Sequence, residues 1–265
     1  MSIDTRKLVS RLRLFESVAI IPRVRSTHEI GRKVVAECVE NEIDLPSAVV
    51  IAREQLNGRG RGSRSWSSPF GKGIYSTIFF SCTSERLALL PLEIAVSLCK
   101  FLRDTFSVEA KVKWPNDILV GGKKLAGILA EARMRDNLAY VLIGIGVNIF
   151  PHREERIANA VSLREVTQQE SLDLDQVTTA FIEHFDQALF TATSAQSIVD
   201  IWRKLTVHQA GDAMLAVVGE RSYNGTWVGI DDDGRALLRQ GDQVVKISAG
   251  DLIAAPPPDA MSNEQ

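Results

Sequence analysis

The sequence predicts an α+β domain followed by a small β-barrel of the SH3-like type. Up to residue 205, runs rich in β-branched residues alternate with stretches whose apolar residues recur at helical spacing. From Gly211 onward, short strands are separated by turns of Gly and Asp, which is typical of a small antiparallel barrel. We therefore expect domains over residues 1–207 and 208–254. The polar, proline-led segment 255–265 is expected to be a disordered tail.

The first elements are predicted from apolar periodicity and from signals at the helix ends. Ser26-Thr27-His28-Glu29 has the capping-box pattern, in which a hydroxyl and a carboxylate satisfy N–H groups at the start of a helix. Pro91 fits the first turn of the longest apolar helix. The elements expected up to that helix are a helix at 4–14, a strand at 17–24, a helix at 26–41, strands at 47–52 and 73–81, and a helix at 87–106.

Strands dominate the rest of the chain, with two helices between them. Gly121-Gly122 is expected to close a tight hairpin, because both residues tolerate the positive φ that such turns require. The expected strands of the first domain are 110–114, 117–120, 124–134 and 139–150, and the helices are 172–192 and 194–205. The expected strands of the second domain are 214–218, 223–230, 236–240 and 244–248.

The composition describes an ordinary globular chain and excludes several classes of protein. Of 265 residues, 45% are apolar and 24% charged, and the formal net charge of −2 argues against a general nucleic-acid binder. Three cysteines without a Cys-x-x-Cys pair fit a reducing compartment. The N-terminus has no apolar signal segment, and no apolar run approaches the roughly 20 residues that span a bilayer. We expect a cytoplasmic protein with no nucleic-acid or membrane partner.

Residues 58–66, here called the arginine loop, are the most informative segment. Arg59, Arg61 and Arg64 alternate with Gly and Ser, so that backbone N–H groups and guanidinium groups can reach one anion. The segment is neither a P-loop nor a dinucleotide fingerprint. Taken alone, it could equally be a flexible basic surface loop. We expect it to be disordered until an anionic ligand supplies counter-charge.

Several other sequence blocks occur with the arginine loop and help to interpret it. They are Lys113 to Asp117, Gly122 to Glu131 and Gly144 to Ile149, with Ser26-Thr27 and Gln55 upstream. In this order and spacing, they resemble the catalytic core of the biotin protein ligases, from about Ser17 to Leu252. The resemblance implies a mixed-sheet catalytic domain of the biotin/lipoate ligase type and an SH3-like C-terminal domain. One branch of that family carries a winged-helix DNA-binding domain ahead of the core. Only about 20 residues precede the core here, too few for such a domain, so we expect the form without it.

The resemblance also implies the reaction. Such a ligase joins the biotin carboxylate to the α-phosphate of ATP, giving biotinyl-5′-AMP, and then transfers biotin to a lysine of a biotin carboxyl carrier protein. That carrier is a subunit of acetyl-CoA carboxylase or of a related carboxylase. Mg²⁺ would arrive with ATP. No His, Cys or Asp cluster of the sequence has the spacing of a zinc site, and no other metal is expected.

Four residues are the expected catalytic groups. Both reactants of the first step are anions, so cations must offset their repulsion. By resemblance, Lys124 contacts the carboxylate and the forming acyl-phosphate, and Arg61 and Arg64 bind phosphates. Asp117 is the acid expected to accept the amine proton in the second step. Its alternative role is to hold the hairpin backbone.

Other residues near these four are expected either to lie outside the site or to bind biotin and ATP. Strand alternation assigns Lys123 to solvent, and Glu131 is expected to be peripheral. The expected biotin-binding residues are Ser26, Thr27, His28, Gln55, Gly58, Arg59, Gly60, Arg61, Lys124, Gly127 and Gly144. The expected ATP-binding residues are Arg59, Arg61, Arg64, Trp66, Asn116, Lys124 and Asn148.

Two of these residues leave open questions. His28 departs from the family pattern, which often has Asn there, and we expect it to contact biotin through its backbone or an imidazole N–H. Trp66 would cover the adenine after loop closure, although a core position would explain it nearly as well.

Two other functions compete with biotin ligation. A lipoate or octanoate ligase or transferase shares the fold, but the chain lacks the Arg-Arg-x-Ser-Gly-Gly-Gly run expected of such enzymes. A non-catalytic biotin sensor would not need Lys124 and all three loop arginines. Exposed edge strands could pair two copies of the chain in a homodimer.

Overall fold

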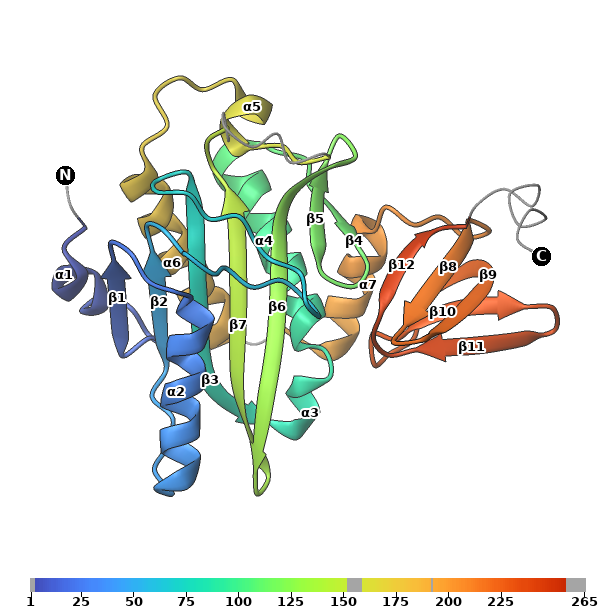
Figure 1. The fold of residues 1–265 in the computed structure, drawn as a ribbon, viewed down its shortest axis with the longest axis horizontal. Helices are drawn as coiled ribbons and strands as arrows, with labels where there is room; N and C mark the ends of the chain where they lie inside the picture. Colours follow the sequence, from blue (N-terminus) through green and yellow to red (C-terminus); the bar gives the residue numbers. More distant parts are fainter. Residues whose placement is uncertain (1–2, 152–158, 192, 256–265) are drawn as a thin grey trace.

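A computed structural model describes residues 3–151, 159–191 and 193–255. It contains a seven-stranded mixed sheet and a separate five-stranded antiparallel sheet at the C-terminal end of the chain (Figure 1). No helix in the described part of the chain is long and apolar enough to cross a membrane.

The large sheet has the strand order β1-β2-β3-β7-β6-β5-β4. Strands β1 and β2 are parallel, and the other neighbours are antiparallel. The strands are β1 (Ser17–Ile21), β2 (Ala48–Ala52), β3 (Gly73–Thr83), β4 (Lys111–Lys113), β5 (Asp117–Val120), β6 (Lys123–Arg135) and β7 (Leu138–Asn148). The longest strands, β3, β6 and β7, form the middle of the sheet and carry the site described below.

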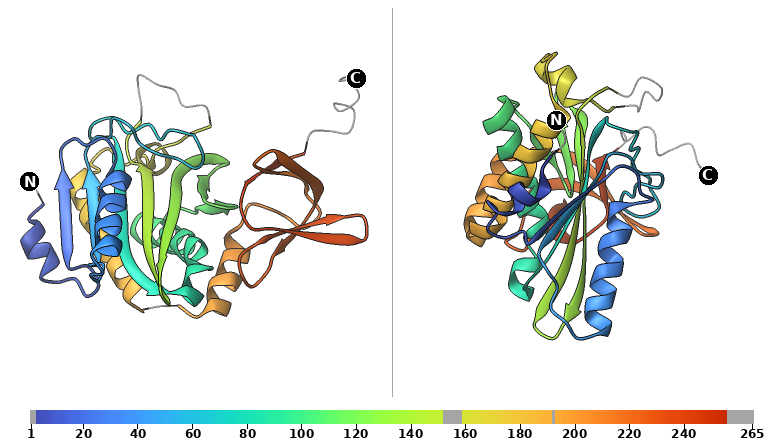
Figure 2. Two further views of the ribbon diagram at one scale, coloured as in Figure 1. Left: turned by 60° about the horizontal axis from the view of Figure 1, so that its bottom comes forward. Right: turned by 90° about the vertical axis from the view of Figure 1, so that its left-hand side faces the viewer.

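Helices cover both faces of this sheet (Figure 2). Alternation along β2 divides the apolar residues, with Val50 in the core under α2 and Val49 and Ile51 in the larger core on the opposite face. Among the described helices, α2 (Thr27–Glu40) is the one that packs on its face of the sheet. The larger core contains α4 (Leu90–Phe106), α6 (Leu174–Thr191) and α7 (Ala195–Leu205), and the short helices are α1 (Thr5–Val9), α3 (Ser84–Leu87) and α5 (Leu163–Thr167).

The small sheet has the order β11-β10-β9-β8-β12, with all neighbours antiparallel. Its strands are β8 (Ala213–Val218), β9 (Arg221–Ile230), β10 (Ala236–Gln240), β11 (Gln243–Ile247) and β12 (Asp251–Ala254). The predicted antiparallel β domain is therefore confirmed. Within residues 213–255 the outer strands β11 and β12 are not paired, so the sheet is curved but not a closed barrel.

Trp114 joins the two sheets. Its side chain is buried, its backbone N–H donates to His208 Nε2 at 3.1 Å, and its indole N–H donates to the Gly234 carbonyl at 3.2 Å. Burial lowers the pKa of His208 to about 4, so the imidazole is neutral near pH 7 and can accept this bond. The C-terminal domain thus rests directly on the block that leads into Asn116 and Asp117.

Several predicted elements differ from the structure. The helix expected at 87–106 begins at Leu90 as α4, with Leu89 at its N-cap position and Pro91 in its first turn, and Leu87 is the last residue of the short helix α3. The first helix ends at Val9, and α5 and β12 were not predicted. In the tail, the Ala255 N–H donates to the Ala213 carbonyl at 2.9 Å. Residues 256–265 and residue 192, the expected end of the helix 172–192, lie outside the described residues.

Candidate active site

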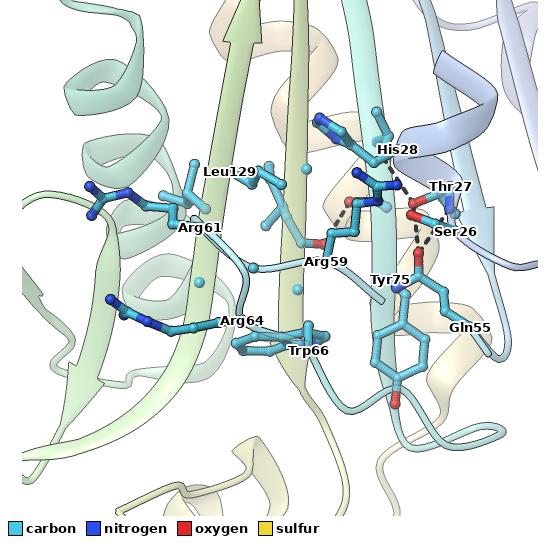
Figure 3. Close-up of a pocket in the computed structure, with 18 of the residues that line it drawn as sticks. Ser26, Thr27, His28, Gln55, Arg59, Arg61, Arg64, Trp66, Tyr75 and Leu129 are labelled. Atoms are coloured by element: carbon cyan, nitrogen blue, oxygen red, sulfur yellow. Dashed lines mark hydrogen bonds between the residues drawn. The ribbon is translucent and has the colours of Figure 1, made fainter. Parts of the chain in front are cut away.

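A cavity of about 90 Å³ lies on the α2 face of the large sheet, over β3, β7 and β6 (Figure 3). Its walls come from the start of α2, the segment after β2, the arginine loop and the three central strands. Every predicted biotin-binding residue lines it except Gly58. Every predicted ATP-binding residue lines it except Asn148, which lines an adjoining cavity of about 150 Å³ with Trp66 and Lys124.

Glycines form the floor of the cavity because an indole ring lies on the strands. Gly127 of β6 and Gly146 of β7 are paired in register, and the Trp66 ring covers both. A Cβ atom at Gly146 would be 2.5 Å from Trp66 Cε2, and one at Gly127 would be 3.0 Å from Cζ3. Only glycine therefore admits the ring at Gly146. The sequence did not single out Gly146, although its spacing from Gly144 places both on one face of β7.

Thr27 and Gln55 orient each other at one end of the cavity. The Thr27 backbone N–H and hydroxyl reach Gln55 Oε1 at 2.8 and 3.1 Å, and the Thr27 hydroxyl lies 2.9 Å from that of Thr77. Gln55 Nε2 in turn donates to Ser68 Oγ at 3.0 Å. These bonds fix two of the predicted biotin-binding side chains before any ligand arrives.

Ser26 lies at the N-cap position of α2, but the predicted capping box does not form. Its backbone is extended, and its Oγ caps no N–H and has no hydrogen-bond partner within the described chain. Glu29, the other half of the expected box, lies 3.2 Å from Arg59 and 3.8 Å from Arg25 instead. Because Ser26 is 1% exposed, an unpaired hydroxyl is left buried at the cavity wall.

His28 follows on the first turn of α2 and contacts Glu131 of β6. Its Nε2 lies 3.3 Å from Glu131 Oε1, and Arg32 binds the same carboxylate in a bidentate manner. The contact with His28 and the bonds from Arg32 lower the pKa of Glu131 to about 2. Glu131 itself does not line the cavity, but β6 brings its carboxylate to His28 of the cavity wall.

Lys124 and Asp117 form an ion pair at the opposite end. Lys124 Nζ lies 2.6 Å from Asp117 Oδ1 and 5.3 Å from the centroid of the Trp66 ring. A register shift between Ile118 and Leu119 occurs where β5 pairs with β6. Lys123 is exposed, as strand alternation predicted.

The arginine loop forms a compact hairpin across the mouth of the cavity. Gly60 N–H donates to the Arg64 carbonyl at 2.8 Å, and Trp66 N–H donates to the Gly58 carbonyl at 2.9 Å. Gly58 closes the base of the loop rather than lining the cavity, because a Cβ there would be 2.3 Å from the Trp66 carbonyl oxygen. Gly62 makes the turn with a φ of 61°.

The chain itself supplies counter-charge to these arginines, contrary to expectation. Arg61 donates to the Gly250 carbonyl at 2.8 Å, Arg64 pairs with Asp251, and Arg59 lies 3.2 Å from Glu29. Burial lowers the pKa of Arg61, whose side chain is 24% exposed. The C-terminal sheet thus holds the two arginines that were predicted to bind phosphates.

Asn116 connects the arginine loop to β6. Its Oδ1 accepts from Arg61 Nη1 at 3.2 Å, and its Nδ2 donates to the Ile128 carbonyl at 2.7 Å. Asn148 donates to the Val161 carbonyl at 3.3 Å. Both predicted nucleotide contacts therefore also have partners inside the protein.

The structure adds lining residues that the sequence did not assign to the biotin site or the ATP site. They are Ser65, Tyr75, Ser76, Thr77, Asp117, Ile128, Leu129, Ile145 and Gly146, of which Asp117 was expected to act but not to line either binding site. Tyr75 is fully buried, and its hydroxyl donates to the Pro69 carbonyl at 3.0 Å. The polar pair Ser76-Thr77 within the apolar run of β3 was the available signal. Among the described residues, no group of three or more His, Cys, Asp or Glu side chains is placed to hold a metal ion.

Comparison with known proteins gives this site a family. Residues 20–148 match the Biotin/lipoate A/B protein ligase family, and residues 215–253 match the Biotin protein ligase C terminal domain. The Bifunctional ligase/repressor BirA of Escherichia coli is 31% identical over 246 residues, which cover 90% of this chain and 74% of that protein. The Biotin--[acetyl-CoA-carboxylase] ligase of Paracoccus denitrificans is 30% identical over 75% of this chain and 88% of its own.

A solved structure supports the same fold. Biotin protein ligase from Aquifex aeolicus in complex with biotin and ATP aligns with a TM-score of 0.70 and 24% identity, over 90% of this chain and 98% of that one. The chain belongs to the biotin/lipoate A/B protein ligase family. The match to the C-terminal domain of biotin protein ligases places it on the biotin side of that family.

Proposed function

We propose that this chain is an ATP-dependent biotin protein ligase, which forms biotinyl-5′-AMP and transfers biotin to a lysine of a biotin carboxyl carrier protein. One observation carries the proposal: a single cavity has buried polar atoms at one end and the cations Lys124, Arg61 and Arg64 at the other. Biotin has the matching shape, with a polar ureido ring, an apolar chain and a carboxylate.

The first step needs the cationic end. An oxygen of the biotin carboxylate attacks the α-phosphorus of ATP, the bond to the bridging oxygen breaks, and pyrophosphate leaves. Lys124 offsets the repulsion between the two anions. Arg61 and Arg64 exchange the carbonyl of Gly250 and the carboxylate of Asp251 for phosphate oxygens, which the planar guanidinium can bind in a bidentate manner. Mg²⁺ enters as part of the ATP complex, held mainly by phosphate oxygens.

The second step needs a proton acceptor. The lysine amine of the carrier attacks the acyl carbon, and AMP leaves with the electrons of the C–O bond. At pH 7 only about one free lysine in a few thousand is neutral, given an ordinary pKa of about 10.4. Asp117 accepts a proton from the attacking amine, and its ion pair with Lys124 keeps the carboxylate beside the reacting acyl-phosphate.

The nucleotide base lies beyond the cationic end. The cavity shared by Trp66, Lys124 and Asn148 adjoins the first one and provides an aromatic face and an amide. We place the adenine there. This assignment keeps the predicted roles of Trp66 and Asn148 and puts the α-phosphate next to Lys124.

The macromolecular partner is a biotin carboxyl carrier domain of acetyl-CoA carboxylase or a related carboxylase, and the Paracoccus denitrificans relative is named for such an activity. Strand β1 forms one edge of the large sheet, where an extended segment of the carrier or a second copy of the chain could pair. The strand at the opposite edge is β4. Its Val112 carbonyl already accepts a hydrogen bond from the Val207 N–H at 2.9 Å. A cytoplasmic location remains part of the proposal.

Two alternatives are weaker. The family description covers lipoate as well as biotin, but the C-terminal match is to the biotin enzymes. A sensor that only binds biotin does not need the ion pair of Lys124 or the three loop arginines, because it does not bring two anions together.

One experiment separates these functions. The protein is incubated with ATP-Mg, a biotin carrier domain and either labelled biotin or labelled lipoate. We expect ATP-dependent labelling of the carrier lysine by biotin alone. Labelling by lipoate would favour the second enzyme class, and tight biotin binding without any labelling would favour the sensor.

A further inference from the structure

We propose that His28 recognises the ureido ring of biotin through Nδ1 acting as a hydrogen-bond acceptor, in a tautomer that Glu131 and Arg32 select. This inference rests on the proposed function, because it names the atom that reads a particular part of that substrate. It differs from the sequence-based expectation that His28 would contact biotin through its backbone or an imidazole N–H.

The His28 side chain is only 4% exposed and lies against strand β7 at the cavity wall. A Cβ atom at Gly144 would be 3.1 Å from Nδ1, so the ring rests on the backbone of that strand. Nδ1 has no hydrogen-bond partner among residues 3–151, 159–191 and 193–255. A buried, unpaired ring nitrogen costs stability unless a ligand satisfies it.

The neighbouring charges select the tautomer. Nε2 faces the Glu131 carboxylate at 3.3 Å, close enough for attraction although the pair is not aligned as a hydrogen bond. A carboxylate favours the proton on the nitrogen that faces it, which leaves the other nitrogen of a neutral imidazole as an acceptor. Arg32 Nε donates to Glu131 Oε2 at 2.7 Å and holds the carboxylate in place.

The remaining charged groups around His28 do not compete for its ring. Glu29 on the same turn of α2 pairs with Arg59 of the arginine loop and with Arg25. Thr77 of β3 bonds to Thr27, and β7 presents the backbone of Gly144. The ring nitrogen on the cavity side is therefore left for the substrate.

The resulting pattern complements a cyclic urea. The ureido ring has two N–H donors and one carbonyl acceptor. His28 Nδ1 accepts from one N–H, and the unpaired Ser26 hydroxyl can donate to the carbonyl or accept from an N–H. The dithiolane ring of lipoate has no N–H group, so it would leave Nδ1 buried and unpaired. Sites built around such a bond reject analogues that lack it.

The test is titration calorimetry of biotin against the full chain at pH 8. His28→Leu, which has no acceptor, should bind biotin about tenfold to a hundredfold more weakly than wild type. His28→Asn retains an acceptor oxygen, so it should bind biotin within about threefold of wild type.

Glu131 and Arg32 are positioning residues in this scheme. Glu131→Gln should weaken biotin binding about threefold to tenfold in the wild-type background, because the tautomer is no longer fixed. It should have no further effect in the His28→Asn background, where there is no tautomer to select. Glu37→Gln removes an exposed carboxylate elsewhere on α2 and serves as the control, with no effect expected. Unfolding midpoints establish that each variant is folded.

Each outcome decides the matter. If His28→Leu binds biotin as tightly as wild type, Nδ1 is not the acceptor. If Glu131→Gln weakens binding equally in both backgrounds, it does not act through His28. These results leave the ligase proposal standing, whereas wild-type protein that fails to bind biotin overturns the ligase proposal itself.

Discussion

Lys124 is the cation on which the proposed first step depends most. Its Nζ has two neighbours, the Asp117 carboxylate at 2.6 Å and the face of Trp66 at 5.3 Å. Both attract the ammonium group and hold it over the floor of the cavity. Lys123, the preceding residue, is exposed and carries the same charge on the opposite face of the strand. The two lysines therefore offer a matched comparison.

Lys124→Ala should slow biotinyl-adenylate formation a few hundredfold, which corresponds to about 3 kcal/mol of lost electrostatic stabilisation. Biotin-dependent release of pyrophosphate measures this rate. Lys123→Ala removes a lysine of the same strand and should leave the rate unchanged. Near-normal pyrophosphate release by Lys124→Ala would remove that residue from the mechanism.

Asp117→Asn should slow the transfer step more than the adenylation step, because only the attack by the amine produces a proton to accept. Single-turnover transfer from preformed biotinyl-adenylate isolates this step. The ion pair with Lys124 means that some loss of adenylation is expected as well. Equal losses in the two half-reactions would reassign Asp117 to holding Lys124.

The place of a side chain in the site could be predicted where the residue belongs to a motif. It could not be predicted where contacts between distant parts of the chain determine its position. Ser26, Gln55, Gly144 and other cavity residues were predicted because their blocks occur in a recognisable order. The contacts of Glu131 with His28 and of Asp251 with Arg64 were not, because each joins residues far apart in the sequence. Such pairs depend on strand register, which a single sequence does not reveal.

Among the elements, the arginine loop is held by contacts that are individually weak. Its ion pairs involve Arg59 and Arg64 side chains that are 38% and 64% exposed. Exposed pairs of this kind contribute about 0–1 kcal/mol each, so the loop can open in solution. Its glycines add to the entropy that closure costs.

Biotin with a non-hydrolysable ATP analogue should therefore slow brief trypsin cleavage after Arg59, Arg61 and Arg64, with other cleavage sites almost unaffected. The ligands replace weak surface pairs by charge-assisted bonds to phosphates. Mass spectrometry of the digest identifies the bonds cut. Cleavage that is equally slow with and without ligands would mean that the loop is already closed in the free protein. Cleavage that is equally fast would mean that the ligands do not close it.

His208, in the segment between α7 and β8, is expected to make the stability of the protein depend on pH. Its pKa of about 4 lies below the ordinary value of 6.5, so the unfolded chain binds the extra proton more readily. The stabilisation from neutral His208 is complete above about pH 6.5 and is lost as pH falls toward 4. Between pH 7 and pH 5 we expect it to contribute a loss of about 2 kcal/mol.

Urea unfolding at pH 7 and pH 5 measures this effect. The carboxylates and His184 also titrate, so His208→Gln, whose amide oxygen can accept from Trp114, gives the comparison. The variant should lose about 2 kcal/mol less than wild type over this interval. Identical losses would show that the His208 contact is not coupled to folding.

Elements with strong local periodicity were predicted well, and those defined by distant partners were not. Strand β5 has the expected ends, and Gly121 and Gly122 form the hairpin with φ values of 56° and 77°. The capping box failed, although its sequence pattern is present, because Ser26 lies at the cavity and Glu29 at the arginines. Strand β12 forms because it pairs with β8, which its own short sequence does not indicate.

For the whole molecule, the two sheets act together at one site. The large sheet carries the cavity on β3, β7 and β6, and the small sheet supplies Gly250 and Asp251 to the arginine loop. Trp114 couples the two, because its indole and backbone both bond to residues of the C-terminal part. Residue 207, the predicted domain boundary, lies between α7 and β8, and residues from both sides of it meet at the arginine loop. The contacts of Gly250 and Asp251 with the arginine loop were not predicted, because no recognisable motif lies there.

Isotope exchange between pyrophosphate and ATP, without any carrier protein, tests the central claim most directly. Exchange requires the enzyme to form and reverse the acyl-adenylate, so it reports only on the chemistry assigned to this cavity. We predict exchange that depends on biotin, is absent with lipoate and falls a few hundredfold in Lys124→Ala. Biotin binding by calorimetry without biotin-dependent exchange would contradict the claim that the cavity joins biotin to ATP.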